Sequence, residues 1–205
     1  MSATVFLLSP ASCAGRRTEI LLSERASFPL AVQLRTRGAE LGDVFSFLSG
    51  LYFRGKLAYA RAFAAPPPGV AATLVITTHR GLLAPETAVT PADIRAFGAV
   101  AIEADNPAYR TPLRDAAATL RGQLPDDARV VLLGSIATAK YTDVLLEVFG
   151  DHLLFPEPFV GRGDMSRGGL LLRAVDERRE LAYIAVRGAV RRGSRPPKLA
   201  PRERR

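Results

Sequence analysis

The sequence predicts an α/β fold: a single three-layer domain with a mostly parallel sheet covered by helices on both faces. Four short segments are apolar throughout rather than alternating, which is typical of strands that are buried on both faces. The longer segments between them carry apolar residues at helical spacing, so strands alternate with helices along the chain. With 205 residues, of which 48% are hydrophobic, the chain is long enough for one sizeable core.

The expected strands are short and end at turn residues. They cover residues 4–9, 72–78, 128–134 and 152–155, and a final strand covers 180–186. The expected helices fill the intervals between them. They cover 18–37 in pieces, 43–64 with Asp43 as the N-cap, a segment that begins at Thr90-Pro91, then 112–124, 138–150 and a segment after Gly168.

Polar residues gather directly after the apolar strands. The carboxyl ends of parallel strands lie at one edge of a sheet, and ligands of open α/β sheets bind outside that edge. We therefore expect a single ligand-binding rim at this edge. Its predicted ligand-binding residues are Ser9, Ser12, Thr78, Arg80, Ser135, Lys140, Arg162, Ser166 and Arg167.

Three residues of this rim are candidate catalytic groups. His79 is the candidate general acid or base, because imidazole titrates near neutral pH, with Asp164 as a potential partner. Cys13 is a candidate nucleophile if Arg16 and Arg17 lower the pKa of its thiol. Each has a structural alternative: a loop histidine bonded to backbone, and a small buried hydrophobe.

The stretch "FVGRGDMSRGGLLLR", residues 159–173, supports two interpretations. Its glycines and arginines suit an anion held at a helix N-terminus. Asp164 and Ser166 are also good N-caps that would occupy the same backbone N–H groups. On the preceding long helix, Arg54 and Lys56 either flank an anionic cleft or form a solvated edge over an apolar face.

The C-terminal residues carry most of the positive charge. The net charge is +8, and eight basic residues but one acidic residue lie from Arg187 to Arg205. We predict a domain at 1–187 and a basic, Pro-rich, disordered tail at 188–205, which either makes the chain more soluble or attracts polyanions. The predicted nucleic-acid-binding residues of the tail are Arg191, Arg192, Arg195 and Lys198.

Several classes of protein are disfavoured by the sequence. It contains no Walker loop, no G-x-G-x-x-G after the first strand, no nucleophile-elbow pentapeptide and no metal-ligand cluster, so neither a cofactor nor a metal is expected. A single cysteine excludes an internal disulfide framework. We interpret the first apolar run as a buried strand rather than a signal peptide, and expect a cytoplasmic protein without membrane contact. The oligomeric state stays open.

Two segments carry a resemblance. The first comprises Ser49, Gly50, Leu51, Tyr52, Phe53 and Lys56, and the second comprises Thr77 to Leu83 with Pro85. Together with the Ser9-Pro10 turn, they resemble the N-terminal half of YaaA-like proteins and related uncharacterised α/β families linked to DNA stress and modified-base metabolism. Thr-Thr-His-Arg stands where that pattern has Ser-Ala-x-Tyr. The resemblance implies a connection with nucleic acids or nucleobases.

These observations lead to one main functional hypothesis and two alternatives. The main hypothesis is a protein that binds a nucleotide, a nucleobase or a nucleic-acid backbone at the rim. Its enzymatic version acts at an N-glycosidic or phosphoester bond. The first alternative is a non-enzymatic nucleic-acid-binding protein that uses its basic tail, and the second is a protein–protein interaction module.

Overall fold

The computed structural model describes residues 2–197 and 199, and it confirms the predicted α/β fold. Its main sheet has six strands in the order β4-β3-β1-β6-β7-β8. The four central strands are parallel: β3 (Thr73–Ile76), β1 (Thr4–Leu8), β6 (Arg129–Leu133) and β7 (Leu153–Pro156). Short antiparallel strands form the edges: β4 (Leu82–Leu83) and β8 (Tyr183–Ala185).

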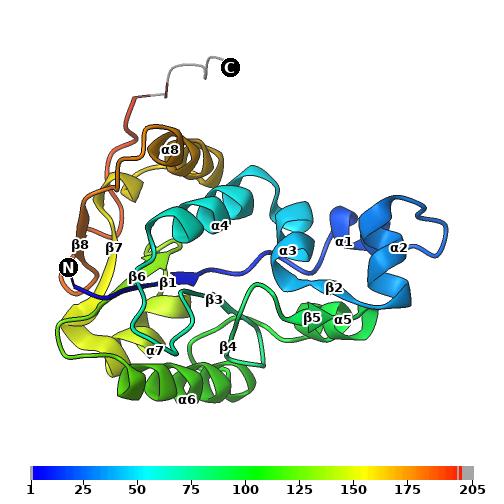
Figure 1. Cartoon of the computed structure of the whole chain (residues 1–205), viewed down its shortest axis with the longest axis horizontal. Coiled ribbons are helices and arrows are strands. Elements are labelled where there is room, and N and C mark those ends of the chain that lie inside the picture. The colour runs from blue at the N-terminus through cyan, green and yellow to red at the C-terminus, as the bar shows by residue number, and fades with distance from the viewer. Residues whose placement is uncertain (1, 198, 200–205) are drawn as a thin grey trace.

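Helices cover both faces of this sheet (Figure 1). One face is covered by α4 (Leu51–Phe63) and α8 (Asp164–Asp176), which pack against each other. The other face is covered by α6 (Pro107–Gln123) and α7 (Ala139–Phe149). Two single-turn 3-10 helices, η1 (Gly150–His152) and η2 (Glu157–Phe159), flank β7.

A group of smaller elements lies beyond the end toward which β1 runs, at the right of Figure 1. It contains four helices and a two-stranded antiparallel sheet of β2 and β5. Their bounds are α1 (Arg16–Leu22), α2 (Pro29–Thr36), β2 (Ala39–Glu40), α3 (Leu41–Ser49), β5 (Ala88–Val89) and α5 (Pro91–Ala99). These elements therefore stand over the carboxyl ends of the parallel strands, where the rim was predicted.

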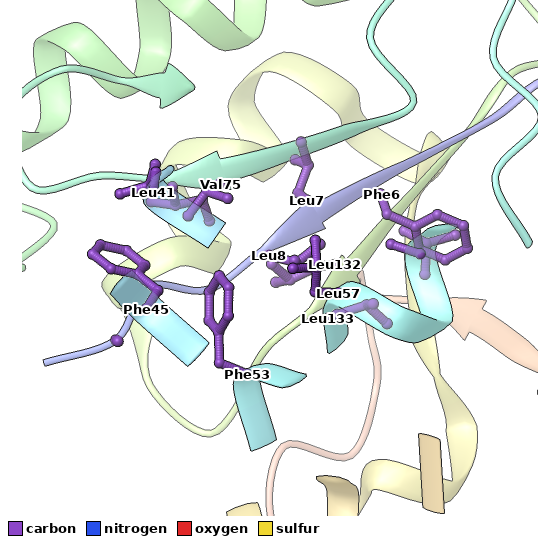
Figure 2. Packing of buried hydrophobic residues seen from close by; sticks show 14 of the residues in the cluster. Phe6, Leu7, Leu8, Leu41, Phe45, Phe53, Leu57, Val75, Leu132 and Leu133 are labelled. Carbon is purple, nitrogen blue, oxygen red and sulfur yellow. The ribbon is translucent and has the colours of Figure 1, made fainter. Parts of the chain in front are cut away.

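The core is centred on β1, which has a neighbouring strand on each side. All five residues of β1 are inaccessible to solvent. Figure 2 shows its side chains among those of the adjacent strands and of α4, including Val75, Leu132, Phe53 and Leu57. Burying one such aliphatic or aromatic side chain stabilises the fold by about 1.5–3 kcal/mol. Because both faces of β1 are buried, apolar residues are favoured on both of them. The strand therefore shows in the sequence as a continuous apolar run.

Two helix starts differ from the prediction. The helix predicted to start after Asp43 begins at Leu41, as α3. Asp43 therefore lies in the first turn of α3 instead of capping it. The helix α6 begins at Pro107, because the Asn106 side chain caps it by accepting from the N–H of Ala108 at 3.1 Å. The predicted start at Pro112 was wrong, since Pro107 also satisfies the preference for proline in a first turn.

Gly50 divides the long predicted helix into α3 and α4. It has a φ of 65°, a left-handed conformation that glycine adopts without strain, and it ends α3 and begins α4 at once. Arg17 of α1 occupies the space beside it and donates from Nη1 to the carbonyls of Phe47 at 3.1 Å and Leu48 at 3.4 Å. A basic side chain thus satisfies carbonyl groups at the end of α3.

Two glycines allow α4 and α8 to approach backbone to backbone. A Cβ on Gly55 of α4 would lie 2.8 Å from the carbonyl oxygen of Gly168 in α8. A Cβ on Gly168 would lie 2.9 Å from both the carbonyl oxygen of Leu51 and the Cα of Tyr52. Because no side chain fits between them, the first turns of α8 lie against the first turns of α4.

Part of the C-terminal segment crosses the loop before α8. The described residues 188–197 form no helix or strand. The backbone of Ser194 lies close to Gly161, and Arg162 donates from Nη1 to the carbonyl of Pro197 at 3.3 Å. Residue 198 and residues 200–205 of the predicted tail lie outside the described part of the chain.

Replacing Gly168 by alanine is expected to lower the free energy of unfolding by about 1–3 kcal/mol, because the new methyl group forces the two helices apart. The matched control is Gly169→Ala, whose Cβ would meet only the Leu199 side chain at an ordinary 3.6 Å. Chemical denaturation measures both. Equal stability of the two variants would contradict the backbone contact.

Candidate functional site

Two adjoining cavities lie at the carboxyl ends of the parallel strands. The Ser9 cavity has a volume of about 260 Å³ and is lined by Ser9, Ser12, Ser49, Tyr52, Ser135 and Asp164, among others. The Cys13 cavity has a volume of about 320 Å³ and is lined by Cys13, Thr78, Phe97 and Lys140, among others. Both are bounded by Pro10, Ala11, Ser12 and Tyr141. The loop after β1 and one tyrosine of α7 therefore form their common wall.

The topology explains why the cavities form at this position. The chain adds β3 on one side of β1 and then β6 on the other, so the strand order reverses at β1. The loops after β1 and β6 leave the sheet in different directions at such a point and open a crevice between them. Ser9 and Ser135, which follow these two strands, both line the Ser9 cavity.

The structure brings together most of the predicted rim. Ser9, Ser12, Ser135 and Asp164 line the Ser9 cavity, and Ser12, Cys13, Thr78 and Lys140 line the Cys13 cavity. The remaining predicted residues line neither cavity: His79, Arg80, Arg162, Ser166 and Arg167.

His79 makes local contacts instead of facing Asp164. Its Nδ1 lies 3.3 Å from Oγ1 of Thr78, and its ring lies 5.3 Å from the ring of Phe97. The neighbouring Arg80 forms an ion pair with Asp93 at 3.3 Å. Asp164 opens into the cavity behind Ser9. The structure therefore does not join His79 and Asp164 as the predicted acid–base pair.

The arginines before and within α8 are bonded to the protein. Arg162 donates to the carbonyl of Pro158 at 3.0 Å and to Oγ of Ser166 at 3.1 Å. Arg167 is buried, donates twice to the carbonyl of Phe159 at 3.3 Å, and pairs with Asp164 at 3.5 Å. These bonds hold the loop against the helix. Arg167 lines neither of the two cavities at the strand ends, whereas Arg162, Asp164 and Ser166 line a separate cavity of about 620 Å³.

The start of α8 also differs from the prediction. Gly163 is the N-cap, and no side chain bonds to the backbone N–H groups of the first turn as a cap. Ser166 receives the Arg162 guanidinium, and Asp164 receives that of Arg167. Neither is the expected N-cap, because α8 begins at Asp164 and both residues lie inside its first turn.

Cys13 lies in an environment that opposes ionisation. Its Sγ lies 3.9 Å from the carbonyl oxygen of Ala11, and burial raises the pKa of its thiol to about 12. The expectation that Arg16 and Arg17 lower this pKa was wrong, since burial raises it and the guanidinium of Arg17 is bonded to the end of α3. At neutral pH Cys13 is therefore a neutral thiol, a weak nucleophile.

Lys56 is the most unusual residue at the rim. It is 1% exposed and lies behind the Ser9 wall of the cavity, with its ammonium group donating to the carbonyl oxygen of Ser9 and, at 2.9 Å, to Oγ of Ser9. Its Nζ also lies over the rings of Tyr52 at 4.5 Å and Phe53 at 4.8 Å. The structure thus excludes a solvated edge for Lys56, whereas Arg54 on the same helix is exposed.

Burial controls the ionisation of this region. Removal from water lowers the pKa of Lys56 to about 7; Asp164 opposes this shift and Arg167 adds to it. Burial also raises the pKa of Tyr52, which the charge of Arg167 partly offsets. Burial, with the charge of Asp164, raises the pKa of Tyr141 to about 12. Both tyrosines are therefore neutral phenols at neutral pH.

Sequence reasoning missed Tyr141 as a site residue. It named Lys56 and Tyr52 on the long helix but did not assign them to the rim. The available signal for Lys56 was its position on the apolar stripe of its helix, four residues after Tyr52 and next to Leu57. A lysine inside such a stripe is almost never fully buried without a partner. Tyr141 gave no comparable signal, because its helix carries polar residues on either side of it.

The described residues show no metal site and no membrane span. Within 2–197 and 199, no three histidine, cysteine, aspartate or glutamate residues are grouped so that they could hold a metal ion. No helix in the same part of the chain is long and apolar enough to cross a membrane.

Comparison with family models, curated proteins and solved structures finds no match to this chain. The resemblance of residues 49–85 to YaaA-like proteins therefore stays a prediction.

Stability is expected to rise with pH because of Lys56. The unfolded chain holds a proton on this amine up to about pH 10, whereas the folded chain releases it near pH 7. Between these values the unfolded state binds more protons, so the free energy of unfolding increases with pH, by about 1 kcal/mol per pH unit.

Urea denaturation between about pH 7 and pH 9 measures this slope. In Lys56→Met the contribution is expected to vanish, whereas Arg54→Met, on the exposed side of the same helix, retains it. Parallel pH profiles for the wild-type chain and Lys56→Met would contradict a buried amine that loses its proton.

Proposed function

We propose that the chain binds a nucleoside or a nucleobase across the Ser9 and Cys13 cavities. One observation carries this proposal: two cavities of about 260 and 320 Å³ share a wall of Pro10, Ala11, Ser12 and Tyr141. Their combined size lies within the range of ordinary small-molecule sites. A ligand with two linked parts, a base and a sugar, matches two small cavities joined at one edge.

The lining offers the contacts that such a ligand requires. Tyr52, Phe97 and Tyr141 supply aromatic surfaces for a base to stack on. Ser12, Ser49 and Ser135 supply hydroxyl groups that can donate to, or accept from, base edges and sugar hydroxyls. The resemblance to proteins linked to modified-base metabolism supports the same class of ligand.

The charges favour a neutral ligand over a nucleotide. Among the described residues, Lys140 is the single basic one that lines the two cavities, and Asp164 contributes a carboxylate. Arg162 and Arg167 are bonded to backbone carbonyls. A phosphate would therefore find one lysine and would face a nearby negative charge. An enzymatic version of this function would act at the N-glycosidic bond of the bound nucleoside rather than at a phosphoester.

Replacing Tyr141 by alanine is expected to weaken nucleoside binding by at least ~10-fold, since stacking on an aromatic side chain contributes about 1–3 kcal/mol per base. Tyr141→Phe keeps the ring and should bind like the wild-type chain. Saturation-transfer NMR with a panel of unmodified and modified nucleosides measures binding, and chromatography of the same samples detects any released base. Equal binding by Tyr141→Ala and the wild-type chain would contradict the proposed site.

The basic C-terminal segment supports a second candidate function, the binding of polyanions. Arg191, Arg192 and Arg195 are exposed, although Arg191 lies 3.6 Å from Asp143. Lys198, which was also predicted to bind nucleic acid, lies outside the described residues. Exposed arginines bind nucleic-acid phosphates by releasing counterions, without reading the sequence.

Deleting residues 188–205 is expected to abolish binding to a random-sequence DNA duplex and to leave nucleoside binding unchanged. Fluorescence anisotropy at several salt concentrations measures the first effect, since the salt dependence reports the number of phosphates neutralised. Unchanged DNA affinity after the deletion would place polyanion binding elsewhere. The interaction-module alternative gains no support, because the face of the long helix α4 is covered by the sheet and by α8.

A further inference from the structure

We propose that Ser9 and Lys56 form a nucleophile–base dyad that transfers the acyl group of a small, uncharged carboxylic ester in the Ser9 cavity. The geometry is that of an activated serine. Ser9 lines the cavity, and its Oγ lies 2.9 Å from Nζ of Lys56 and 3.3 Å from the carbonyl oxygen of Leu133. The shorter of these contacts is within the distance at which a hydroxyl passes its proton to a base. This inference does not depend on nucleoside binding.

The hydrogen bonds around Lys56 suit a neutral amine as well as an ammonium ion. Nζ has two polar partners, the carbonyl oxygen and the hydroxyl group of Ser9. In the ammonium form Nζ donates to Oγ of Ser9, and the Ser9 hydroxyl donates to the carbonyl of Leu133 at 3.3 Å. A neutral amine instead donates one hydrogen to the Ser9 carbonyl, and the Ser9 hydroxyl turns from Leu133 to donate to its lone pair. The carbonyl bond fixes the amine so that its lone pair faces Oγ. An amine that is neutral near physiological pH is what a serine–lysine dyad requires of its base.

The surroundings of Lys56 keep it available as a base. Tyr52 and Phe53 cover it with their rings, and it is 1% exposed, so water does not stabilise the ammonium form. The charged groups that face it come from α8: Asp164 favours the ammonium, and Arg167 opposes it. With burial as the largest effect, the pKa of Lys56 falls to about 7.

Tyr52 supplies an independent indication of a ligand at this position. Its side chain is 5% exposed and lines the Ser9 cavity, and its hydroxyl group has no acceptor among the described residues. A buried phenol without an acceptor costs stability unless a ligand accepts its hydrogen. Ser135 adds a second donor, because its Oγ accepts from the N–H of Ala137 at 3.3 Å and leaves its hydrogen free. Two such donors would stabilise the oxyanion of an acyl-transfer intermediate.

The steps conserve atoms and charge. Oγ of Ser9 forms a bond to the ester carbonyl carbon while its proton moves to Nζ of Lys56. The carbon–oxygen bond to the alcohol then breaks, and the alcohol leaves with that proton. A water molecule next gives a proton to Lys56 and attacks the acyl-serine. The carboxylic acid is released, and the proton returns to Oγ of Ser9.

The cavity limits the substrate class. Its volume is about 260 Å³, and it holds the carboxylate of Asp164 but no lining arginine or lysine. A phosphoester or a carboxylate-bearing substrate would meet that charge without a counterion. A short uncharged ester avoids this repulsion.

The test uses the full chain with a fluorophosphonate reagent and with 4-nitrophenyl acetate. Peptide mass spectrometry is expected to place one fluorophosphonate group, or one acetyl group, on Ser9. Labelling should rise with pH to a plateau, with a midpoint near pH 7, where Lys56 loses its proton. Ser46→Ala, on α3 outside the cavity, should react at the wild-type rate.

The variants separate the roles of the residues. Lys56→Met should slow labelling by at least ~100-fold and remove its pH dependence, and Tyr52→Phe should slow it by about 100-fold, as expected for loss of an oxyanion donor. If Lys56→Met fails to fold, the proposal is tested by the pH profile of wild-type labelling and by Ser9→Ala, which should not be labelled. Labelling at another serine, labelling of Ser9 that ignores pH, or no labelling of the folded chain would overturn the proposal.

Discussion

The backbone contact between Gly55 and Gly168 is the constraint on which the rest of this structure depends. It brings α8 so close to α4 that no side chain separates them. The first turn of α8 then places Asp164 at the Ser9 cavity and Arg167 beside Tyr52. At a wider helix spacing Lys56 would face water, and a lysine in water has no reason to lose its proton. The packing of α8 against α4 thus helps to set the pKa of Lys56.

The stretch at residues 159–173 illustrates how local and tertiary demands combine. Its arginines look like anion ligands in isolation, and its aspartate and serine look like helix caps. In the fold each pairs with a neighbour in the same stretch: Arg162 with Ser166, and Arg167 with Asp164. Gly169 has room for a side chain, whereas Gly168 makes the backbone contact with α4. The stretch stabilises the wall of the Ser9 cavity, and Arg162 and Ser166 line a separate cavity of about 620 Å³.

The fold was predictable because its strands are buried on both faces and therefore carry an unbroken apolar pattern. The same pattern places Ser9, Thr78 and Ser135 at the shared edge, because each directly follows such a strand. It cannot show where a side chain points after the strand has ended, so His79 and Arg80 were expected at a site that they do not line. The burial of Lys56 was not predicted for a different reason: the charges of Asp164 and Arg167 that act on it come from α8, more than one hundred residues away in the chain.

Gly50 joins two helices that both contribute to the lining of the Ser9 cavity. Leu48 and Ser49 at the end of α3 line one part of that cavity, and Tyr52 at the start of α4 lines another. The angle between these two helices therefore sets how far apart these lining residues lie. Arg17 of α1 ties down the last carbonyls of α3 at that junction, although it contacts neither cavity itself. An exposed guanidinium thus holds the helix end that carries Leu48 and Ser49, one part of the lining of the Ser9 cavity.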